Sequence, residues 1–281
     1  MNPEVLIIGC GFLGETTASL FSTQGKRVLG LVRSQESLNK LTGRAFKTAL
    51  CDVTDDASVK SLSFMVQRVP LAVYMVSSNG GGAEEYAAVY RDGLARVVES
   101  WHPQKIIFVS STSVYAQDDS SWVTEESPAI PERETSKVLL EAEQIALAAG
   151  GTVARLTGIY GPGRSMLLRK FLAGEAVLEK GRGRYLNQIH RDDGAAALLY
   201  LSEAELPCGI YNVTDNTPAT QRELYGWIAD FLKLPLPFEG PANLNRKRGF
   251  TSKRISNAKL RGLGWSPRYP SYREALPSLM S

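Results

Sequence analysis

Residues 4–25 read EVLIIGCGFLGETTASLFSTQG, and this stretch decides the fold that the sequence predicts. Its first part, EVLIIG, is apolar or β-branched at nearly every position, which is typical of a strand buried in a parallel sheet. Its second part places Leu13, Thr17, Leu20 and Phe21 at helical spacing, so we expect an amphipathic helix that ends at Gly25. A strand, a glycine-rich turn and a helix in this order form the first unit of an α/β sheet.

The glycines between that strand and that helix have the spacing G-x-G-x-x-G, at Gly9, Gly11 and Gly14. The first permits a tight turn, the second lets main chain approach a diphosphate, and the third lets helix and strand pack closely. The diphosphate would meet the helix N-terminus at Phe12 and Leu13. Because strand, turn and helix all have the required positions, we interpret the loop as a dinucleotide site rather than a simple glycine-rich turn.

The end of the next apolar run favours NADP over NAD as the cofactor. An NAD site usually has an acidic residue there to bind the adenosine ribose, but this chain has Val32 followed by Arg33. An arginine can form charge-assisted hydrogen bonds to a 2′-phosphate, which an acidic residue would repel. The alternative is that Arg33 is an ordinary surface residue.

Two later strand ends supply further candidates for cofactor binding. Asp52 and Val53 follow the third apolar run, where the Asp52 carboxylate could accept a hydrogen bond from the adenine amino group, while Asp55 suits the cap of the next helix. Ser77 and Ser78 follow the fourth run, at the edge where ligands bind in open sheets of this kind. Simple polar termination of a strand remains the alternative for both serines.

The alternation of short apolar runs with helix-like segments predicts a Rossmann-type, doubly wound parallel sheet. We expect residues 1–160 to form the NAD(P)-binding domain, with a strand and helix from about 186–215 returning to it. Residues 161–281 would mostly form a smaller, interleaved substrate-binding lobe. The other runs that we interpret as buried strands are KRVLGLV, AFKTALC, LAVYMVSS, KIIFVSS and GTVARLTG.

Composition narrows the class of protein. No stretch reaches the roughly 20 apolar residues that span a bilayer, and no signal-peptide pattern is present, so we expect a cytoplasmic protein. The three cysteines lack metal-ligand spacing, so we expect them to be reduced and buried, and we expect no metal. The net charge is only +3, but residues 241–273 hold nine Lys or Arg and no acid. Without stacking aromatic residues this stretch does not indicate nucleic acid; Arg246, Lys247 and Arg248 within it suit a diphosphate-bearing small molecule.

Eight motifs in order make the chain resemble the extended short-chain dehydrogenase/reductase family, which includes nucleotide-sugar epimerases and dehydratases. They are GCGFLG, CDVTD, VSSTSVYA, WVTEESPAIPE, SK at 136–137, RLTGIYGPGR, IHRDD and IYNVTD, and they extend over nearly the whole chain. The resemblance implies an NAD(P)-dependent oxidoreductase or isomerase acting on a nucleotide sugar or another carbonyl or hydroxyl compound. It also implies a homodimer formed through helices near residues 86–100 and 137–149.

The resemblance further implies a catalytic Ser/Thr, a Tyr that exchanges the proton, and a Lys four residues after that Tyr. Ser111 and Lys137 match the first and last of these, and Lys137 would also hold the nicotinamide ribose, but Arg133 occupies the place of the tyrosine. Arginine stays protonated at physiological pH, so it cannot exchange a proton as a phenol does, although it can polarise a carbonyl or bind an anion. The chain therefore suits an atypical subgroup without the active-site tyrosine.

Several residues could serve the substrate or replace the missing proton donor. Tyr115 and Tyr90 are the candidate donors, with packing as the alternative for each. His190 could line the substrate cleft or be a structural histidine, and Arg164 could bind an anionic substrate or be solvated. We interpret Asp192 or Asp193 as the cap of the helix that follows them.

Two functions remain open from the sequence. The first is an NADP-dependent enzyme of non-standard mechanism that uses Ser111 and Lys137. The second is a module that binds NADP(H) without chemistry and reports its redox state to a partner. The presence of both Ser111 and Lys137 favours the enzyme, whereas Arg133 favours the module.

Overall fold

The computed structural model describes residues 2–66, 69–78, 80–181, 183–203, 205–241 and 251–280. Its contacts divide the chain into two compact units, each made of three chain segments. Unit 1 consists of Met1–Val114, Ile130–Arg155 and Ala195–Tyr211, and unit 2 of Tyr115–Ala129, Leu156–Gly194 and Asn212–Ser281. In the described part of the chain, no helix is both long and apolar enough to cross a bilayer.

The centre of unit 1 is a seven-stranded sheet with the strand order β12-β7-β5-β4-β1-β2-β3. The pairs β1–β2, β1–β4, β2–β3 and β4–β5 are all parallel. Chain order reverses between β1 and β4, so this is the switch point at which ligands bind in doubly wound sheets. The strands are β1 (Val5–Ile8), β2 (Val28–Val32), β3 (Lys47–Leu50), β4 (Leu71–Tyr74), β5 (Lys105–Ser111), β7 (Thr152–Leu156) and β12 (Ile210–Val213). The expected doubly wound α/β fold is confirmed.

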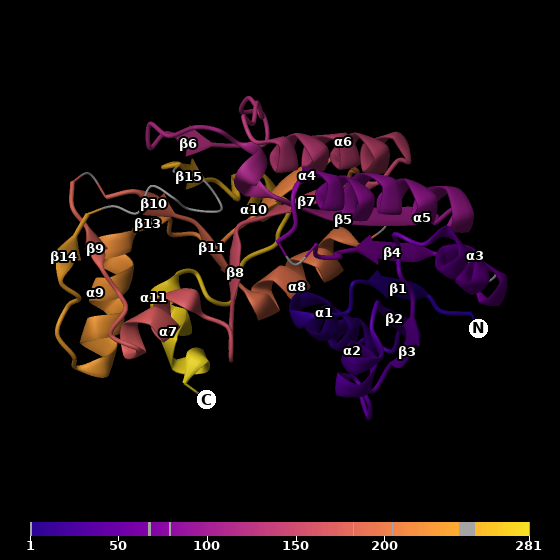
Figure 1. The fold of residues 1–281 in the computed structure, drawn as a ribbon, viewed down its shortest axis with the longest axis horizontal. Helices are drawn as coiled ribbons and strands as arrows, with labels where there is room; N and C mark the ends of the chain where they lie inside the picture. Colours follow the sequence, from indigo (N-terminus) through magenta and orange to yellow (C-terminus); the bar gives the residue numbers. More distant parts are fainter. Residues whose placement is uncertain are drawn as a thin grey trace. The chain divides into compact units, whose positions relative to one another are not determined.

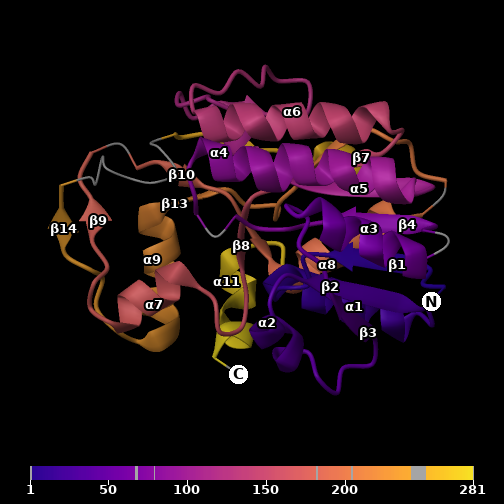
Figure 2. The same cartoon turned by 45° about the vertical axis from the view of Figure 1, so that its right-hand side comes forward.

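Helices cover both faces of this sheet (Figure 1). The segments α3, α5 and α6 lie on one face, with α4 and the π-helical turn η1 directly before α5, whereas α1 and the later part of α8 lie on the other (Figure 2). Their bounds are α1 (Phe12–Thr23), α2 (Gln35–Lys40), α3 (Asp56–Met65), α4 (Ala83–Tyr86), η1 (Ala87–Asp92), α5 (Gly93–Trp101), η2 (Thr112–Val114), α6 (Glu134–Ala148) and α8 (Arg191–Leu201). As expected, α1 ends directly before Gly25, whose φ is +78°.

One predicted strand differs in burial from our expectation. We interpreted AFKTALC as a buried strand, but β3 exposes its two end residues and half-buries the middle two. The reason is its place in the sheet, because β3 is the edge strand and has a neighbour, β2, on one side only.

The described residues of unit 2 form four two-stranded pairs and short helices. Its apolar core gathers Tyr160, Leu168, Phe171, Ile228 and Tyr272 with neighbours from α7, α9 and α11. The strands are β6 (Trp122–Val123), β8 (Gly158–Tyr160), β9 (Leu178–Glu179), β10 (Tyr185–Leu186), β11 (Gln188–His190), β13 (Ala219–Thr220), β14 (Glu239–Gly240) and β15 (Arg254–Ile255). The helices are α7 (Met166–Leu172), α9 (Gln221–Leu232), α10 (Ala258–Gly262), α11 (Tyr272–Ala275) and η3 (Leu276–Leu279).

Candidate functional site

The glycine loop joins β1 to α1 in a conformation that only glycine permits at two positions. Gly9 has φ +95°, and a Cβ on it would lie 2.7 Å from main-chain atoms of Met75 and Val76 at the end of β4. A Cβ on Gly14 would lie 2.4 Å from the Gly9 carbonyl oxygen, so α1 packs against the turn only without a side chain there. A Cβ on Gly11 would meet nothing within 4 Å. The loop is therefore closed towards the sheet and open at Gly11.

The first turn of α1 begins at this open side. Gly11 is the N-cap residue and has no side chain that could cap the helix, and Phe12 and Leu13 are the first two residues of α1. The acidic residue of this turn, Glu15, is paired with Arg44 at 2.5 Å. An uncapped, positively polarised helix end beside open space fits the diphosphate of a dinucleotide.

The ends of β2 and β3 lie directly beside the loop. The amides of Gly9 and Cys10 donate to the Leu31 carbonyl at 3.1 and 2.8 Å, and the Cys51 amide donates to the Val32 carbonyl at 2.9 Å. Arg33 therefore follows two residues, of which Leu31 is bound to the glycine loop and Val32 to the end of β3. It is exposed, and within the described residues it has no hydrogen bond or ion pair. Its guanidinium can therefore donate hydrogen bonds to an anionic ligand.

Asp52 and Asp55 have different local roles. Asp52 Oδ1 accepts hydrogen bonds from the Thr54 amide at 2.9 Å and the Thr54 hydroxyl at 2.7 Å. Asp55 caps α3 by accepting from the amides of residues 57 and 58, which confirms that expectation. Val53 is buried, and its carbonyl accepts from Arg96 Nη1 at 2.5 Å. The Asp52 carboxylate is thus held in a fixed orientation at the end of β3.

Ser77 and Ser78 follow β4 on the sheet edge that carries the glycine loop. Ser77 is exposed and Ser78 is buried. Burial raises the pKa of Tyr90, and the side chains of both serines and the Ser78 main chain oppose this, so the two serines lie near the Tyr90 hydroxyl. The two serines therefore contact a tyrosine, and do more than terminate a strand.

Ser111 lies at the end of β5 and is half-buried. Its hydroxyl oxygen accepts from the Ser113 amide at 3.2 Å, and the Ser113 hydroxyl lies 3.4 Å from that of Ser136 on α6. This series of short contacts connects the end of β5 to the first turn of α6. Ser111 and the start of α6 therefore belong to one local structure within unit 1.

Arg133 and Lys137 lie one helical turn apart, because the Arg133 carbonyl accepts from the Lys137 amide at 3.0 Å. Arg133 is the N-cap residue of α6 and is exposed. Lys137 is also exposed, and its amino group contacts the Glu134 carboxylate at 2.7 Å. The lysine is thus held by a carboxylate three residues earlier, and the chain offers a permanent cation where a phenol was expected.

A buried network beneath these residues was not predicted from the sequence. The Glu143 carboxylate, fully buried, accepts from Arg155 Nε at 2.9 Å and Nη2 at 2.5 Å, and from the Ser110 hydroxyl at 2.6 Å. Arg155 lies on β7, Ser110 on β5 and Glu143 on α6. The network holds α6 against the strand that ends at Ser111. Its only sequence signal is an Arg within an otherwise apolar strand and a Glu on the apolar face of a helix.

Tyr115, the other candidate proton donor, lies in unit 2 and is 1% exposed. Its hydroxyl donates to Asn212 Oδ1 at 3.0 Å, and its carbonyl accepts from Lys253 Nζ at 2.7 Å. Burial lowers the pKa of Lys253 to about 8. These contacts are those of a packed, structural tyrosine, which is the alternative that the sequence left open.

His190 and Asp193 are buried in unit 2, whereas Asp192 is only half-buried. The His190 ring is fully buried, and its Nδ1 accepts a hydrogen bond from the Asp192 amide at 3.2 Å. The side chain that accepts from an amide in the first turn of α8 is therefore that of His190 and not that of an aspartate. Burial lowers the pKa of His190. Asp193 lies inside the first turn and accepts from the amides of Arg268 and Tyr269 at 2.7 and 3.0 Å. The expectation that an aspartate caps this helix is therefore wrong, because Asp193 binds a distant loop instead.

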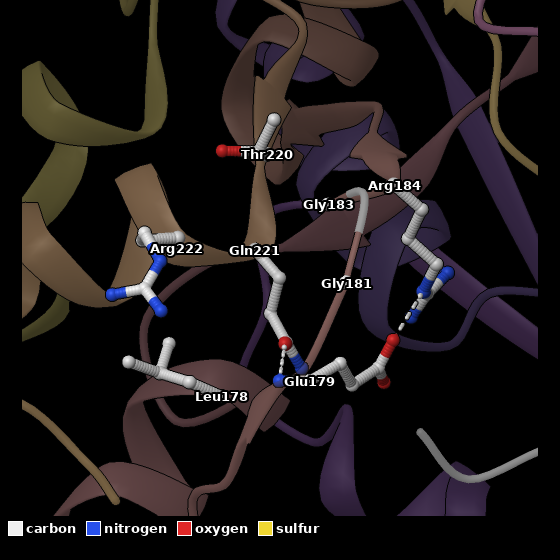
Figure 3. A pocket seen from close by; sticks show the side chains of 8 residues that line it. All are labelled: Leu178, Glu179, Gly181, Gly183, Arg184, Thr220, Gln221 and Arg222. Carbon is white, nitrogen blue, oxygen red and sulfur yellow. Dashed lines mark hydrogen bonds and ion pairs between the residues drawn. The ribbon is translucent and has the colours of Figure 1, made fainter. Parts of the chain in front are cut away.

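A polar hollow of about 220 Å³ lies in unit 2 between β9, the loop after it and the start of α9. Figure 3 shows the Arg184 guanidinium directed at the Glu179 carboxylate, 3.5 Å away, while Arg222 extends in another direction. Burial lowers the pKa of Arg184. Gln221 Oε1 accepts from the Glu179 amide at 3.0 Å and closes one side. No pattern in the sequence pointed to this hollow.

The remaining predictions have separate outcomes. Arg164 is exposed in the turn after β8, where its amide and carbonyl exchange hydrogen bonds with Gly161 at 2.9 and 3.1 Å. Arg246, Lys247 and Arg248 lie outside the described residues. Cys10 and Cys51 are buried as expected, but Cys208 is exposed, because it lies in the loop before β12 and not in an element.

Comparison with known proteins agrees with this architecture. The chain is 33% identical to a solved structure described as a "putative NAD-dependent epimerase/dehydratase" from Methylobacillus flagellatus, which covers 100% of this chain and 98% of that one with a TM-score of 0.81. It is 28% identical to protein YeeZ of Escherichia coli K12 over 95% of this chain and 96% of YeeZ. It is 25% identical to a 3-diazoavenalumate denitrifying reductase of a Streptomyces species, over 97% and 99% of the two chains.

The family assignment rests on the sequence as well as on the fold. Residues 5–214 match the family described as NAD dependent epimerase/dehydratase. This range contains the glycine loop, Ser111, Arg133 and Lys137. The chain therefore belongs to the NAD-dependent epimerase/dehydratase family.

Proposed function

We propose that this protein is a dinucleotide-dependent oxidoreductase that prefers NADP and reduces a carbonyl compound, by a mechanism that does not use a tyrosine at position 133. The observation that carries the proposal is the glycine loop, which is closed by the contacts of Gly9 and Gly14 and open at Gly11. Such a loop has no structural need for glycine at position 11. A ligand that approaches the main chain at position 11, where a side chain would block it, explains the glycine.

The chain's own residues would hold the cofactor as follows. The first turn of α1, which begins at Phe12 and Leu13, binds the diphosphate, and the exposed Arg33 binds the 2′-phosphate of NADP. Asp52 and Val53 lie where the adenine would be bound. When bound, the reduced nicotinamide supplies a hydride.

Ser111, Arg133 and Lys137 would serve the substrate. The Ser111 hydroxyl can donate to the carbonyl oxygen, and Lys137 can hold the nicotinamide ribose after its contact with Glu134 is exchanged. Arg133 offers a fixed positive charge that stabilises negative charge as it develops on oxygen. A nucleotide-sugar-like or otherwise anionic substrate suits this charge. For unit 2 taken by itself, we propose the exposed Arg164 as a residue that binds an anionic group.

The relative that is named a 3-diazoavenalumate denitrifying reductase supports reduction as the type of reaction. It is similar to this chain over almost the full length of both proteins. In a reductive step the carbonyl carbon accepts a hydride, and negative charge develops on the carbonyl oxygen. Arg133 can stabilise this charge without exchanging a proton.

The test is a fluorescence titration of the protein with NADPH and with NADH. We expect tighter binding of NADPH, and Arg33→Glu should weaken NADPH binding by roughly 10- to 100-fold, because hydrogen bonds to a charged group contribute about 1.5–3 kcal/mol. Lys47→Glu is the matched control, since it makes the same charge change on the exposed strand β3. Failure of both dinucleotides to bind would refute the proposal.

A second function, the redox-reporting module, is favoured by the Lys137–Glu134 contact and by Arg133. A lysine engaged by a carboxylate beside a non-titrating cation resembles a surface more than a reaction centre. This function predicts dinucleotide binding that changes hydrogen exchange in the lobe of unit 2, with no cofactor oxidation for any carbonyl substrate in a screen. Turnover of a single substrate decides for the enzyme.

A further inference from the structure

The helical segment between α4 and α5 contains a π-helical turn, η1, over Ala87–Asp92. Single π turns are uncommon and frequently occur at functional sites. The cause here is Tyr74, a fully buried residue of β4, whose hydroxyl donates to the Val89 carbonyl at 2.5 Å. A Cβ on Gly93 would lie 2.6 Å from that hydroxyl, so glycine allows the close approach. The hydroxyl of Tyr74, a residue of the sheet, thus donates a hydrogen bond to a carbonyl oxygen of the helical segment, and the turn is widened there.

The widened turn carries Tyr90, which is half-buried. Its hydroxyl lies near the side chains of Ser77 and Ser78 and the Ser78 main chain, which oppose the rise in its pKa. Its ring lies 4.9 Å from that of Tyr86 and is tilted against it by 45°. The ring contact with Tyr86 therefore restrains Tyr90, and its hydroxyl lies near the exposed Ser77.

This hydroxyl lies at the switch point of the sheet. Ser77 directly follows Val76, whose Cα would be 2.7 Å from a Cβ on Gly9 of the glycine loop. Tyr74 and Phe108 are paired in register on β4 and β5, and Ser77 and Ser111 each come three residues later. The phenol of Tyr90 therefore belongs to the same sheet edge as the glycine loop and Ser111, all within unit 1.

We propose that Tyr90 is a catalytic residue that donates the proton which Arg133 cannot donate. This inference rests on the proposed function. In the reduction, the hydride and its electron pair form the new C–H bond at the carbonyl carbon, and the C=O π pair moves to oxygen. That oxygen takes the phenolic proton of Tyr90, with Ser111 as its second hydrogen-bond donor. The phenolate regains a proton from water through the exposed hydroxyl of Ser77.

The surroundings of Tyr90 suit a proton donor rather than a base. Burial and the neighbouring Tyr86 raise its pKa, and the hydrogen bonds from the two serines oppose this. Tyr74 lies below the turn, and the ion pair of Arg91 with Asp92 and Glu141 joins the same turn to α6. The phenol is thus protonated at neutral pH, which is the state needed to donate to an alkoxide and the wrong state to deprotonate an alcohol.

The experiment places 3-fluorotyrosine at position 90 and follows its ¹⁹F resonance while the protein is titrated with NADPH, NADP⁺ and 2′,5′-ADP. We expect a shift with both complete dinucleotides and none with 2′,5′-ADP, which lacks the nicotinamide half. The same label at Tyr200, on α8 at the other face of the sheet, is the control and should not move. A pH titration of the NADP⁺ complex should show the phenol protonated throughout the neutral range.

The outcomes separate the two proposals. If no dinucleotide binds, the proposed function fails and Tyr90 has no role to fill. If NADPH binds but the resonance at position 90 does not move, or the phenol is ionised at neutral pH, the assignment of Tyr90 is wrong while the cofactor assignment stands. With a substrate from a carbonyl screen, Tyr90→Phe should reduce kcat by about 10²–10⁴-fold at a nearly unchanged Kd for NADPH. Tyr86→Phe is the matched control, and equal turnover by both variants would overturn the inference.

Discussion

Removing one partner of the buried Glu143–Arg155 pair should be one of the most damaging single changes in unit 1. The Glu143 carboxylate is fully buried and receives two bonds from Arg155 and one from Ser110. Arg155→Met leaves that carboxylate without its counter-ion, which typically costs about 3–5 kcal/mol. In domains of this size 1 kcal/mol corresponds to roughly 2–4 °C, so we expect Tm to fall by about 6–20 °C.

The control lies on the same helix. Glu141, two residues before Glu143, forms an exposed ion pair with Arg91 at 3.1 Å. Exposed pairs contribute about 0–1 kcal/mol, so Glu141→Gln should change Tm by only a few degrees, roughly 0–4 °C. Thermal unfolding followed by circular dichroism measures both changes.

A double variant tests the physical reason. Glu143→Leu with Arg155→Met removes both charges, and replacement of a whole buried pair by apolar residues is often neutral. We expect the double variant to recover most of the loss, which gives a coupling energy of opposite sign to the single effects. The reasoning is refuted if Arg155→Met has the same Tm as the original protein, or if the Tm of the double variant is no higher than that of Arg155→Met. Either result would mean that the uncompensated buried charge is not the cause of the loss of stability.

Three further predictions follow from local geometry. Gly14→Ala should destabilise the fold measurably in urea unfolding, because its Cβ would lie 2.4 Å from a carbonyl oxygen, whereas Gly11→Ala should leave stability within about 0.5 kcal/mol and weaken only dinucleotide binding. Burial lowers the pKa of Lys253 from 10.5 to about 8, so between these values only the unfolded state keeps the lysine protonated, and the contribution of Lys253 to stability should rise with pH by up to roughly 3 kcal/mol. The buried thiols of Cys10 and Cys51, whose pKa values are raised from 9.0 to about 12 and about 11, make stability fall with pH in part of the same window. The free energy of unfolding of the original protein minus that of Lys253→Met should therefore increase with pH in this window, and a difference independent of pH would contradict the assignment. In the native protein, a thiol reagent should modify the exposed Cys208 quickly and the two buried cysteines only on unfolding, and rapid modification of all three would show that the burial is wrong.

Most of the fold of unit 1 was predictable because it is specified by local patterns. The spacing of Gly9, Gly11 and Gly14, the apolar run before them and the amphipathic helix after them lie within about twenty residues. The same holds for the Asp55 cap and for the end of α1 before Gly25. Each of these features depends on steric and hydrogen-bonding needs of adjacent residues, so no knowledge of distant contacts is required.

By itself, the sequence determined the doubly wound sheet, the glycine-rich loop after its first strand and the absence of a tyrosine four residues before Lys137. Only the tertiary structure decided that β3 is an exposed edge, that Glu143 rather than Glu141 is buried on α6, and that Asp193 binds a distant loop. It also decided that Tyr115 is packed while Tyr90 reaches the switch point through a turn widened by Tyr74. The physical reason is common to all of them: burial and hydrogen-bond partners are set by segments far apart in the chain, and periodicity along one segment carries no information about which segment packs against it.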